Sequence, residues 1–125
     1  MKYVLLFAGT MEEEERAKNP EVAAAYARAG EWFADHFRRG KFVDGHELKG
    51  PQTATTVQFR DGKPMVMDGP FIEAKEIIGG YALVEVADLD EALAIAKSWP
   101  GGTSVEVRPV VDHSADRPDT GSPAS

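Results

Sequence analysis

The segment 68–81 constrains the fold of this chain more than any other part of the sequence. Pro70 fixes its own φ and has no amide N–H, and the Asp-Gly pair before it favours a turn, so a preceding strand ends here. Two glycines then allow close backbone approaches just before a new apolar run. We predict a stiff turn that places Phe71 in the core. The segment reads Asp68-Gly69-Pro70-Phe71-Ile72-Glu73-Ala74-Lys75-Glu76-Ile77-Ile78-Gly79-Gly80-Tyr81.

Residue patterns on both sides of this segment predict an α+β chain. Apolar or alternating runs predict strands at 3–8, 41–48, 81–86 and 103–110, and a hairpin over 54–67 that turns at Asp61-Gly62. Periodic apolar residues predict helices over 20–39 and from 88–91 onward, while the charged run 11–19 fits a loop or a helix start. We expect a ferredoxin-like fold with two helices on one face of a mostly antiparallel sheet.

The first long helix is the clearest element. Asn19 is a suitable N-cap, Pro20 suits the first turn, and Gly40 suits the position just past the last turn. Gly30 in its interior costs up to about 1 kcal/mol relative to alanine, and we attribute it to close packing. One apolar stripe should face the sheet: Val22, Tyr26, Ala29, Phe33 and Phe37.

Composition and charge exclude several classes of function. The 125 residues fit one domain at 1–111 followed by a flexible C-terminal tail at 112–125, which is poor in apolar residues. The net charge of −7 argues against a nucleic-acid partner, and the absence of cysteine removes disulfides and thiolate chemistry. The opening apolar run is too short for a membrane span or a secretion signal. We expect a soluble, cytoplasmic protein.

Several of these residues also carry a family resemblance. Asp68-Gly69-Pro70-Phe71, Lys75-Glu76 and Gly79-Gly80-Tyr81 resemble the signature of the DGPF branch of the YCII-related family, and the likeness extends to about Val110. The resemblance implies a dimeric α+β barrel, in which the open sheet faces of two subunits pack together. Two helices cover only one face of a sheet, so an uncovered apolar face also favours a homodimer. The activity of the family is undefined.

The resemblance has two further implications. DGPF proteins are similar to partners of extracytoplasmic-function sigma factors, which implies a sigma-factor association. The wider family is similar to enzymes with a proposed His-Asp pair whose histidine lies on the first helix. The matching position here is Ala29, so we transfer no catalytic histidine.

Two residues are the candidates for acid–base catalysis. Asp68 ends a strand in a proline-stiffened turn, where it either acts as a carboxylate in a pocket or hydrogen-bonds the backbone of its own turn. His46 lies on a predicted strand and titrates near neutral pH, although a structural role is the alternative.

Four more residues are candidates for binding a substrate. Lys75 and Glu76 form either a substrate clamp or a mutually neutralising pair. Tyr81 offers a phenol or packs in the core, and Arg108 binds an anion or a neighbour such as Glu106. No spacing of histidines, carboxylates or glycines suggests a metal or cofactor. Two functions remain: a small-molecule-binding protein or enzyme with a pocket near Asp68, or a non-catalytic interaction module.

Overall fold

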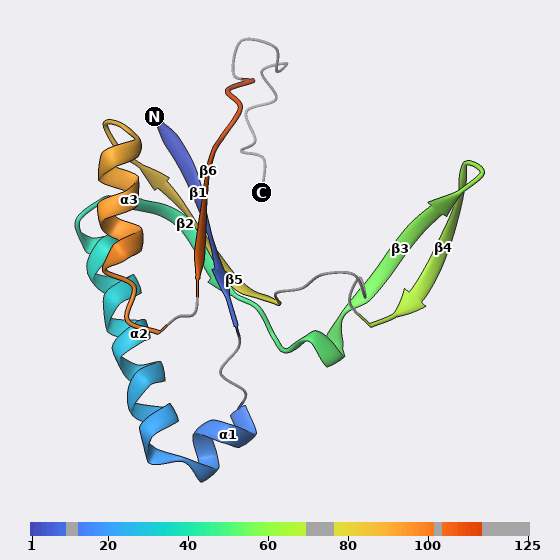
Figure 1. The fold of residues 1–125 in the computed structure, drawn as a ribbon, viewed down its shortest axis with the longest axis horizontal. Coiled ribbons are helices and arrows are strands. Elements are labelled where there is room, and N and C mark those ends of the chain that lie inside the picture. The colour runs from blue at the N-terminus through green and yellow to red at the C-terminus, as the bar shows by residue number, and fades with distance from the viewer. Residues whose placement is uncertain (10–12, 70–76, 102–103, 114–125) are drawn as a thin grey trace.

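The computed structural model describes residues 1–9, 13–69, 77–101 and 104–113. Figure 1 shows a layer of helices against a sheet, with a two-stranded hairpin extending away from both. The elements are β1 (Lys2–Ala8), α1 (Glu13–Lys18), α2 (Pro20–Arg38), β2 (Phe42–Glu47), the short 3-10 turn η1 (Pro51–Thr53), β3 (Thr55–Arg60), β4 (Lys63–Asp68), β5 (Ile78–Glu85), α3 (Leu89–Lys97) and β6 (Val105–Pro109).

The main sheet has four strands in the order β2-β5-β1-β6, and each neighbouring pair is antiparallel. Helices α2 and α3 lie on one face of it (Figure 1). This arrangement confirms the predicted α+β, ferredoxin-like fold. The expectation of two helices is incomplete, because the acidic run contains the short helix α1, whose first-turn glutamates suit the positive end of a helix.

Local sequence signals explain where the helices and the hairpin turn form. The Asn19 side chain accepts a hydrogen bond of 2.9 Å from the Glu21 amide at the start of α2. Gly40 follows that helix with a φ of +74°, which suits glycine. Asp61 and Gly62 have φ values of +50° and +76°, the left-handed geometry of a tight hairpin turn. The caps and the turn predicted at these residues are confirmed.

The core lies between the helices and the sheet. Alternate residues of β1 are buried there, namely Tyr3, Leu5 and Phe7, together with Ala82 and Val84 of β5. Phe7 is also packed among three other aromatic rings, with centroid distances of 5.8 Å to Trp32, 5.1 Å to Phe33 and 4.6 Å to Trp99. Because side chains alternate along a strand, the residues between these on β1 and β5 face the opposite, uncovered side. We call that side the open face.

The hairpin β3–β4 is a separate two-stranded sheet, which we call the arm. In Figure 1 it projects from the body of the molecule. Hydrogen bonds close it at its own base, from the Gly69 amide to the Ala54 carbonyl at 2.8 Å and from the Thr56 hydroxyl to the Gly69 carbonyl at 2.7 Å.

Among the described residues, no helix is long and apolar enough to cross a membrane.

Two of the predictions fall on parts of the chain that are not described. Phe71, which we expect in the core, lies within residues 70–76. Of the expected tail, residues 114–125 also lie outside the described residues. Both expectations stay predictions.

Candidate functional site

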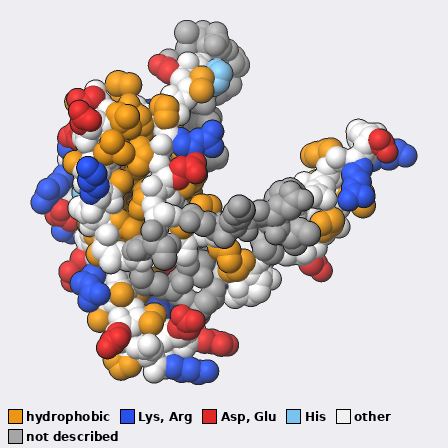
Figure 2. Space-filling model, viewed as in Figure 1, with side chains coloured by type: hydrophobic (Ala, Val, Ile, Leu, Met, Phe, Trp, Pro, Cys, Tyr) orange, Lys and Arg blue, Asp and Glu red, His pale blue; other side chains and the backbone are white. Residues whose placement is uncertain are grey.

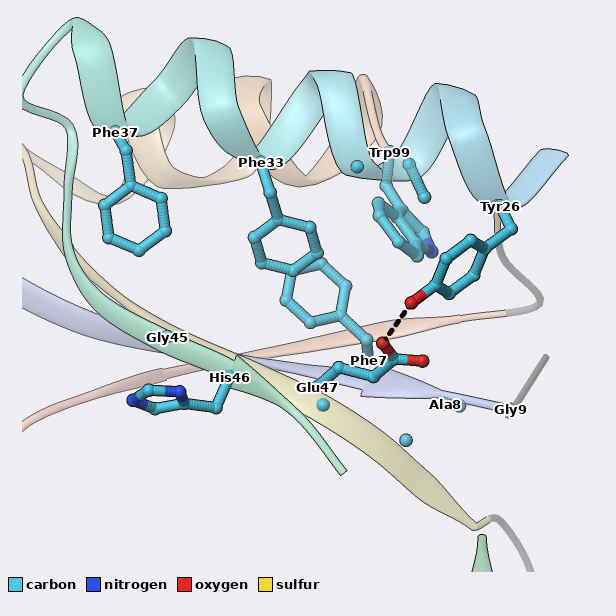
Figure 3. Close-up of a pocket in the computed structure, with 15 residues that line it drawn as sticks. Phe7, Ala8, Gly9, Tyr26, Phe33, Phe37, Gly45, His46, Glu47 and Trp99 are labelled. Carbon is cyan, nitrogen blue, oxygen red and sulfur yellow. Dashed lines mark hydrogen bonds between the residues drawn. The ribbon is translucent and has the colours of Figure 1, made fainter. Parts of the chain in front are cut away.

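A cavity of about 500 Å³ lies between α2 and the helix-covered face of the sheet. Figure 3 shows Phe33 and Phe37 pointing from α2 toward the strands, while the Phe7 ring extends from β1 toward the Phe33 ring. Tyr26 and Glu47 close one end of the space. This volume lies within the range of pockets for small molecules. The lining residues are Phe7, Ala8, Gly9, Tyr26, Ala29, Gly30, Phe33, Phe37, Gly45, His46, Glu47, Gly79, Gly80, Trp99 and Gly101.

Glycine makes room for this cavity on α2. A Cβ added to Gly30 would meet no atom of the described residues within 4 Å, so the glycine borders open space in that part of the structure. Our attribution of Gly30 to close packing is therefore wrong. Close packing does occur at Gly45 on β2, where an added Cβ would lie 2.9 Å from the Tyr81 carbonyl oxygen. Ala29, the position at which the family resemblance would place a histidine, also lines the cavity.

The end of the cavity formed by Tyr26 and Glu47 is polar. The Tyr26 hydroxyl donates a hydrogen bond of 2.6 Å to Glu47 Oε1. The guanidinium of Arg16 on α1 lies 3.9 Å from the centre of the Tyr26 ring and 4.0 Å from the Glu47 carboxylate. The hydrogen bond to Glu47, aided by partial burial, raises the pKa of Tyr26 above its usual value of 10.0. Tyr26 is therefore a protonated hydrogen-bond donor at neutral pH.

Trp99, another residue that lines the cavity, has a polar atom without a partner among the described residues. Trp99 Nε1 is buried and makes no hydrogen bond within the described structure. The second indole N–H of the chain does have an acceptor, since Trp32 Nε1 donates a hydrogen bond of 2.8 Å to Ser98 Oγ. In Figure 3 the nitrogen-bearing edge of Trp99 is turned toward the end of the cavity that Tyr26 closes. The cavity thus has largely apolar walls, and one of its lining side chains carries a buried N–H that lacks an acceptor within the described residues.

A second group of polar side chains lies on the open face. The register pairs His46 of β2 with Tyr81 of β5, and Asp44 with Leu83. Asp44 Oδ1 lies 3.3 Å from His46 Nε2, while Asp44 Oδ2 accepts a hydrogen bond of 3.3 Å from the Tyr81 hydroxyl. Although His46 borders the cavity, its ring points away from the cavity in Figure 3. Partial burial and the Asp44 carboxylate raise the pKa of Tyr81 above 10.0.

The structure brings two of the predicted site residues together and places two others apart from them. His46 and Tyr81 meet through Asp44. Arg108 lies on β6, 3.8 Å from Glu106, and β5 and β1 separate β6 from β2 in the sheet. Asp68 ends β4 in the arm, opposite Thr55, and does not line the cavity described above. Lys75 and Glu76 lie outside the described residues. The roles assigned to these six residues stay predictions.

Sequence reasoning missed several of the polar residues in both groups. The alternation of Asp44 and His46 on one strand was a usable signal, because residues two apart face the same side of a sheet. The pairing of Tyr26 with Glu47 and the unpartnered Trp99 had no such signal, because they depend on how α2 and α3 dock on the strands. Within the described ranges, no cluster of histidines and carboxylates is placed to hold a metal ion.

Comparison with known proteins agrees with the fold. Residues 1–114 match the family model for the YCII-related domain. The chain is also 34% identical over 107 residues to a Rhizobium meliloti (strain 1021) protein described as "uncharacterized protein R00369", a match that covers 82% of this chain and 80% of the relative. The DGPF branch within the family stays a prediction. Because the family model matches nearly the whole length of the chain, this chain belongs to the YCII-related family.

Proposed function

We propose that the protein binds a small, largely apolar molecule that carries at least one hydrogen-bond acceptor, in the cavity between α2 and the sheet. The single observation that carries the proposal is the buried Trp99 N–H, which lacks an acceptor within the described structure, in the wall of a cavity of about 500 Å³. Leaving a buried donor without a partner costs about 1–3 kcal/mol. The Trp99 N–H is closed off from the cavity in this structure, so a ligand acceptor would recover that loss by drawing the indole N–H toward it.

The other walls define what kind of molecule fits. Phe33 and Phe37 offer ring surfaces to apolar or aromatic groups. At the polar end, Glu47 is already balanced by the Tyr26 hydroxyl and by Arg16, so a ligand would need no net charge of its own there. We therefore expect a neutral aromatic molecule with a carbonyl-type acceptor to bind better than a plain hydrocarbon.

A matched pair of helix substitutions tests whether the cavity is used. Gly30→Leu would extend a side chain into the open space, whereas Ala27→Leu adds a side chain at an exposed position of α2. Benzamide serves as the acceptor-bearing probe and toluene as the probe without an acceptor. Titrations followed by ligand-detected NMR should show binding to the wild type and to Ala27→Leu, and no binding to Gly30→Leu. Equal binding by all three proteins would contradict the proposal.

The role of Trp99 is tested separately through selectivity. Trp99→Phe keeps an aromatic ring and removes the N–H donor. The wild type should prefer benzamide over toluene by about tenfold, which corresponds to about 1.4 kcal/mol for a hydrogen bond to an otherwise unpaired donor. The variant should lose that preference while still binding both probes. A preference that survives in Trp99→Phe would remove the observation on which the ligand class rests.

The open face supports a second candidate function, acid–base catalysis. Asp44 lies within 3.3 Å of both the His46 imidazole and the Tyr81 hydroxyl. A carboxylate that orients an imidazole is a recurring arrangement for proton transfer, because it fixes the ring and stabilises its charged form. Here His46 would be the general base, with Asp44 as the residue that orients it.

A generic acyl substrate can test this second function. If His46 acts as a base or nucleophile, hydrolysis of p-nitrophenyl acetate should be faster than the uncatalysed reaction, and His46→Gln should abolish the difference. Asp44→Asn should lower the rate without removing the imidazole. His36 provides the control, since its Nδ1 lies 2.9 Å from the Trp32 carbonyl on α2, away from the open face. Loss of activity in His36→Gln alone would contradict the assignment.

A further inference from the structure

The short helix α1 brings one side chain, that of Arg16, to the polar end of the cavity. None of the residues of α1 is buried, and Arg16 is the one residue of this helix that is partly shielded from solvent. Its side chain is only 24% exposed. Figure 2 shows acidic and basic side chains together at the end of the molecule where α1 lies. Arg16 therefore differs from the solvated charges around it, because its side chain packs against the body of the protein.

The contacts of Arg16 join α1 to both walls of the cavity end. Glu13 lies one turn earlier on α1, at a spacing that favours an ion pair. Among the described residues, however, the ion pair of Arg16 is with Glu47 of β2, at 4.0 Å. The same guanidinium lies 3.9 Å from the centre of the Tyr26 ring of α2. Three elements that are separate in the sequence thus meet around one cation.

Glu47 supplies the negative charge of the cavity. It is the one acidic residue among the described residues that line the cavity, and no lysine or arginine is among them. Figure 3 shows its carboxylate joined to the Tyr26 hydroxyl across the cavity end, by the hydrogen bond of 2.6 Å. Arg16 itself does not line the cavity, so it acts on a bound molecule through Glu47 and Tyr26.

This charge balance determines which molecules the cavity can hold. Transfer of a cation from water to an apolar cavity is strongly unfavourable unless an opposite charge lies beside it. A ligand cation near Glu47 would have to share the carboxylate with Arg16, and the guanidinium would repel it. An anion would be repelled by the carboxylate. The polar end therefore favours neutral molecules as long as Arg16 holds its place.

We propose that Arg16 sets the charge selectivity of the cavity: by neutralising Glu47 from outside, it makes the cavity accept neutral aromatic molecules and reject aromatic cations of the same shape. This inference rests on the proposed binding function and adds the residue that decides the charge of the ligand. Arg16 is a positioning residue, because it does not touch the ligand. Without it, a carboxylate and an aromatic ring would be left at the cavity end, and these are the groups that bind organic cations.

Benzamide and benzamidine test the proposal, because they share a ring and a planar head group while benzamidine is positively charged at pH 7. In ligand-detected NMR titrations, the wild type should bind benzamide more tightly than benzamidine. Arg16→Met keeps an unbranched side chain and removes the charge. It should bind benzamidine at least about tenfold more tightly than the wild type does, and benzamide equally well. Lys18→Met removes the same charge from an exposed position of α1 and should behave as the wild type.

A double variant tests whether the Glu47 carboxylate is the group that Arg16 neutralises. Glu47→Gln removes the negative charge and keeps an oxygen that can accept from the Tyr26 hydroxyl. Arg16→Met combined with Glu47→Gln should lose the gain in benzamidine affinity and still bind benzamide. A gain that persists in the double variant would overturn the proposal, because the cation would then not depend on this carboxylate.

The remaining outcomes separate this inference from the binding function. The inference is wrong, and the binding function stands, if the wild type binds both probes equally or if Arg16→Met keeps the wild-type preference. A shift in Lys18→Met as large as that in Arg16→Met has the same meaning. Loss of benzamide binding in Arg16→Met alone would make Arg16 a structural residue and would also overturn the selectivity role. If none of the proteins binds benzamide, the binding function itself fails, and the inference fails with it.

Discussion

At the scale of single residues, two glycines have opposite surroundings: one borders a cavity and the other lies in a close backbone contact. Gly30 sits inside α2 with open space where its Cβ would be, whereas Gly45 on β2 approaches the Tyr81 carbonyl. The same substitution should therefore change stability in opposite directions at the two positions.

Gly30→Ala should raise the free energy of unfolding by about 0.5–1 kcal/mol, because alanine restricts the unfolded chain and favours a helix interior. Gly45→Ala should lower it by roughly 1–3 kcal/mol, since the added methyl group forces the two strands apart. Urea denaturation followed by circular dichroism gives both values. If Gly30→Ala is destabilising, the space beside α2 is filled and the cavity is smaller than described.

At the scale of elements, the start of α3 is held by two carboxylates. Asp88 caps the helix by accepting a hydrogen bond of 2.9 Å from the Glu91 amide. Glu91 accepts from the Ala87 amide at 2.8 Å and from the Lys41 ammonium at 2.7 Å. The hydrogen bond from Lys41, together with that from Ala87, lowers the pKa of Glu91 below its usual value of 4.5. The end of α2 is thereby tied to α3 through Lys41.

This shift predicts a pH dependence that belongs to Glu91. A pKa that is lower in the folded protein means that the charged carboxylate favours folding. The contribution is present above about pH 4.5 and is lost as the pH falls through the lowered folded pKa. Melting curves between pH 7 and pH 3 should show a smaller acid-induced loss of stability for Glu91→Gln than for the wild type. Identical pH profiles would show that the Lys41 contact is absent in solution.

The arm is the element that should be removable without unfolding the body. Thr55 and Asp68 are paired at its base, so the two ends of the cut chain are neighbours. Replacing residues 55–68 with a two-residue Asn-Gly turn should preserve the near-UV circular dichroism of the aromatic cluster around Phe7 and Trp32. Loss of that signal would show that the arm contributes to the core of its own subunit.

At the scale of the whole molecule, the order of strands and helices was predictable and their docking was not. Alternation fixed which residues of β1 and β5 face the helices, and turn residues such as Asp61 located the hairpin. The cavity depends instead on gaps left where α2 crosses glycines of the sheet, and no periodicity encodes such gaps. Likewise, the exposure of Phe59 could not be predicted, because a strand in a projecting hairpin and a strand in a covered sheet show the same alternation of apolar and polar residues.

The homodimer predicted from the family resemblance would make the stability of the whole molecule depend on its concentration. Association favours the folded state by mass action, so the melting temperature of the wild type should rise as the protein is concentrated from 1 to 100 μM. Sedimentation should give about twice the chain mass of 13.6 kDa over the same range.

Leu83→Asp, which places a carboxylate on the open face, should melt at a temperature that does not change with concentration, because a monomer has no association to lose. The wild type at its lowest concentration should approach the melting temperature of that variant. A wild-type melting temperature that is constant from 1 to 100 μM, with a monomer in sedimentation, would contradict the dimer.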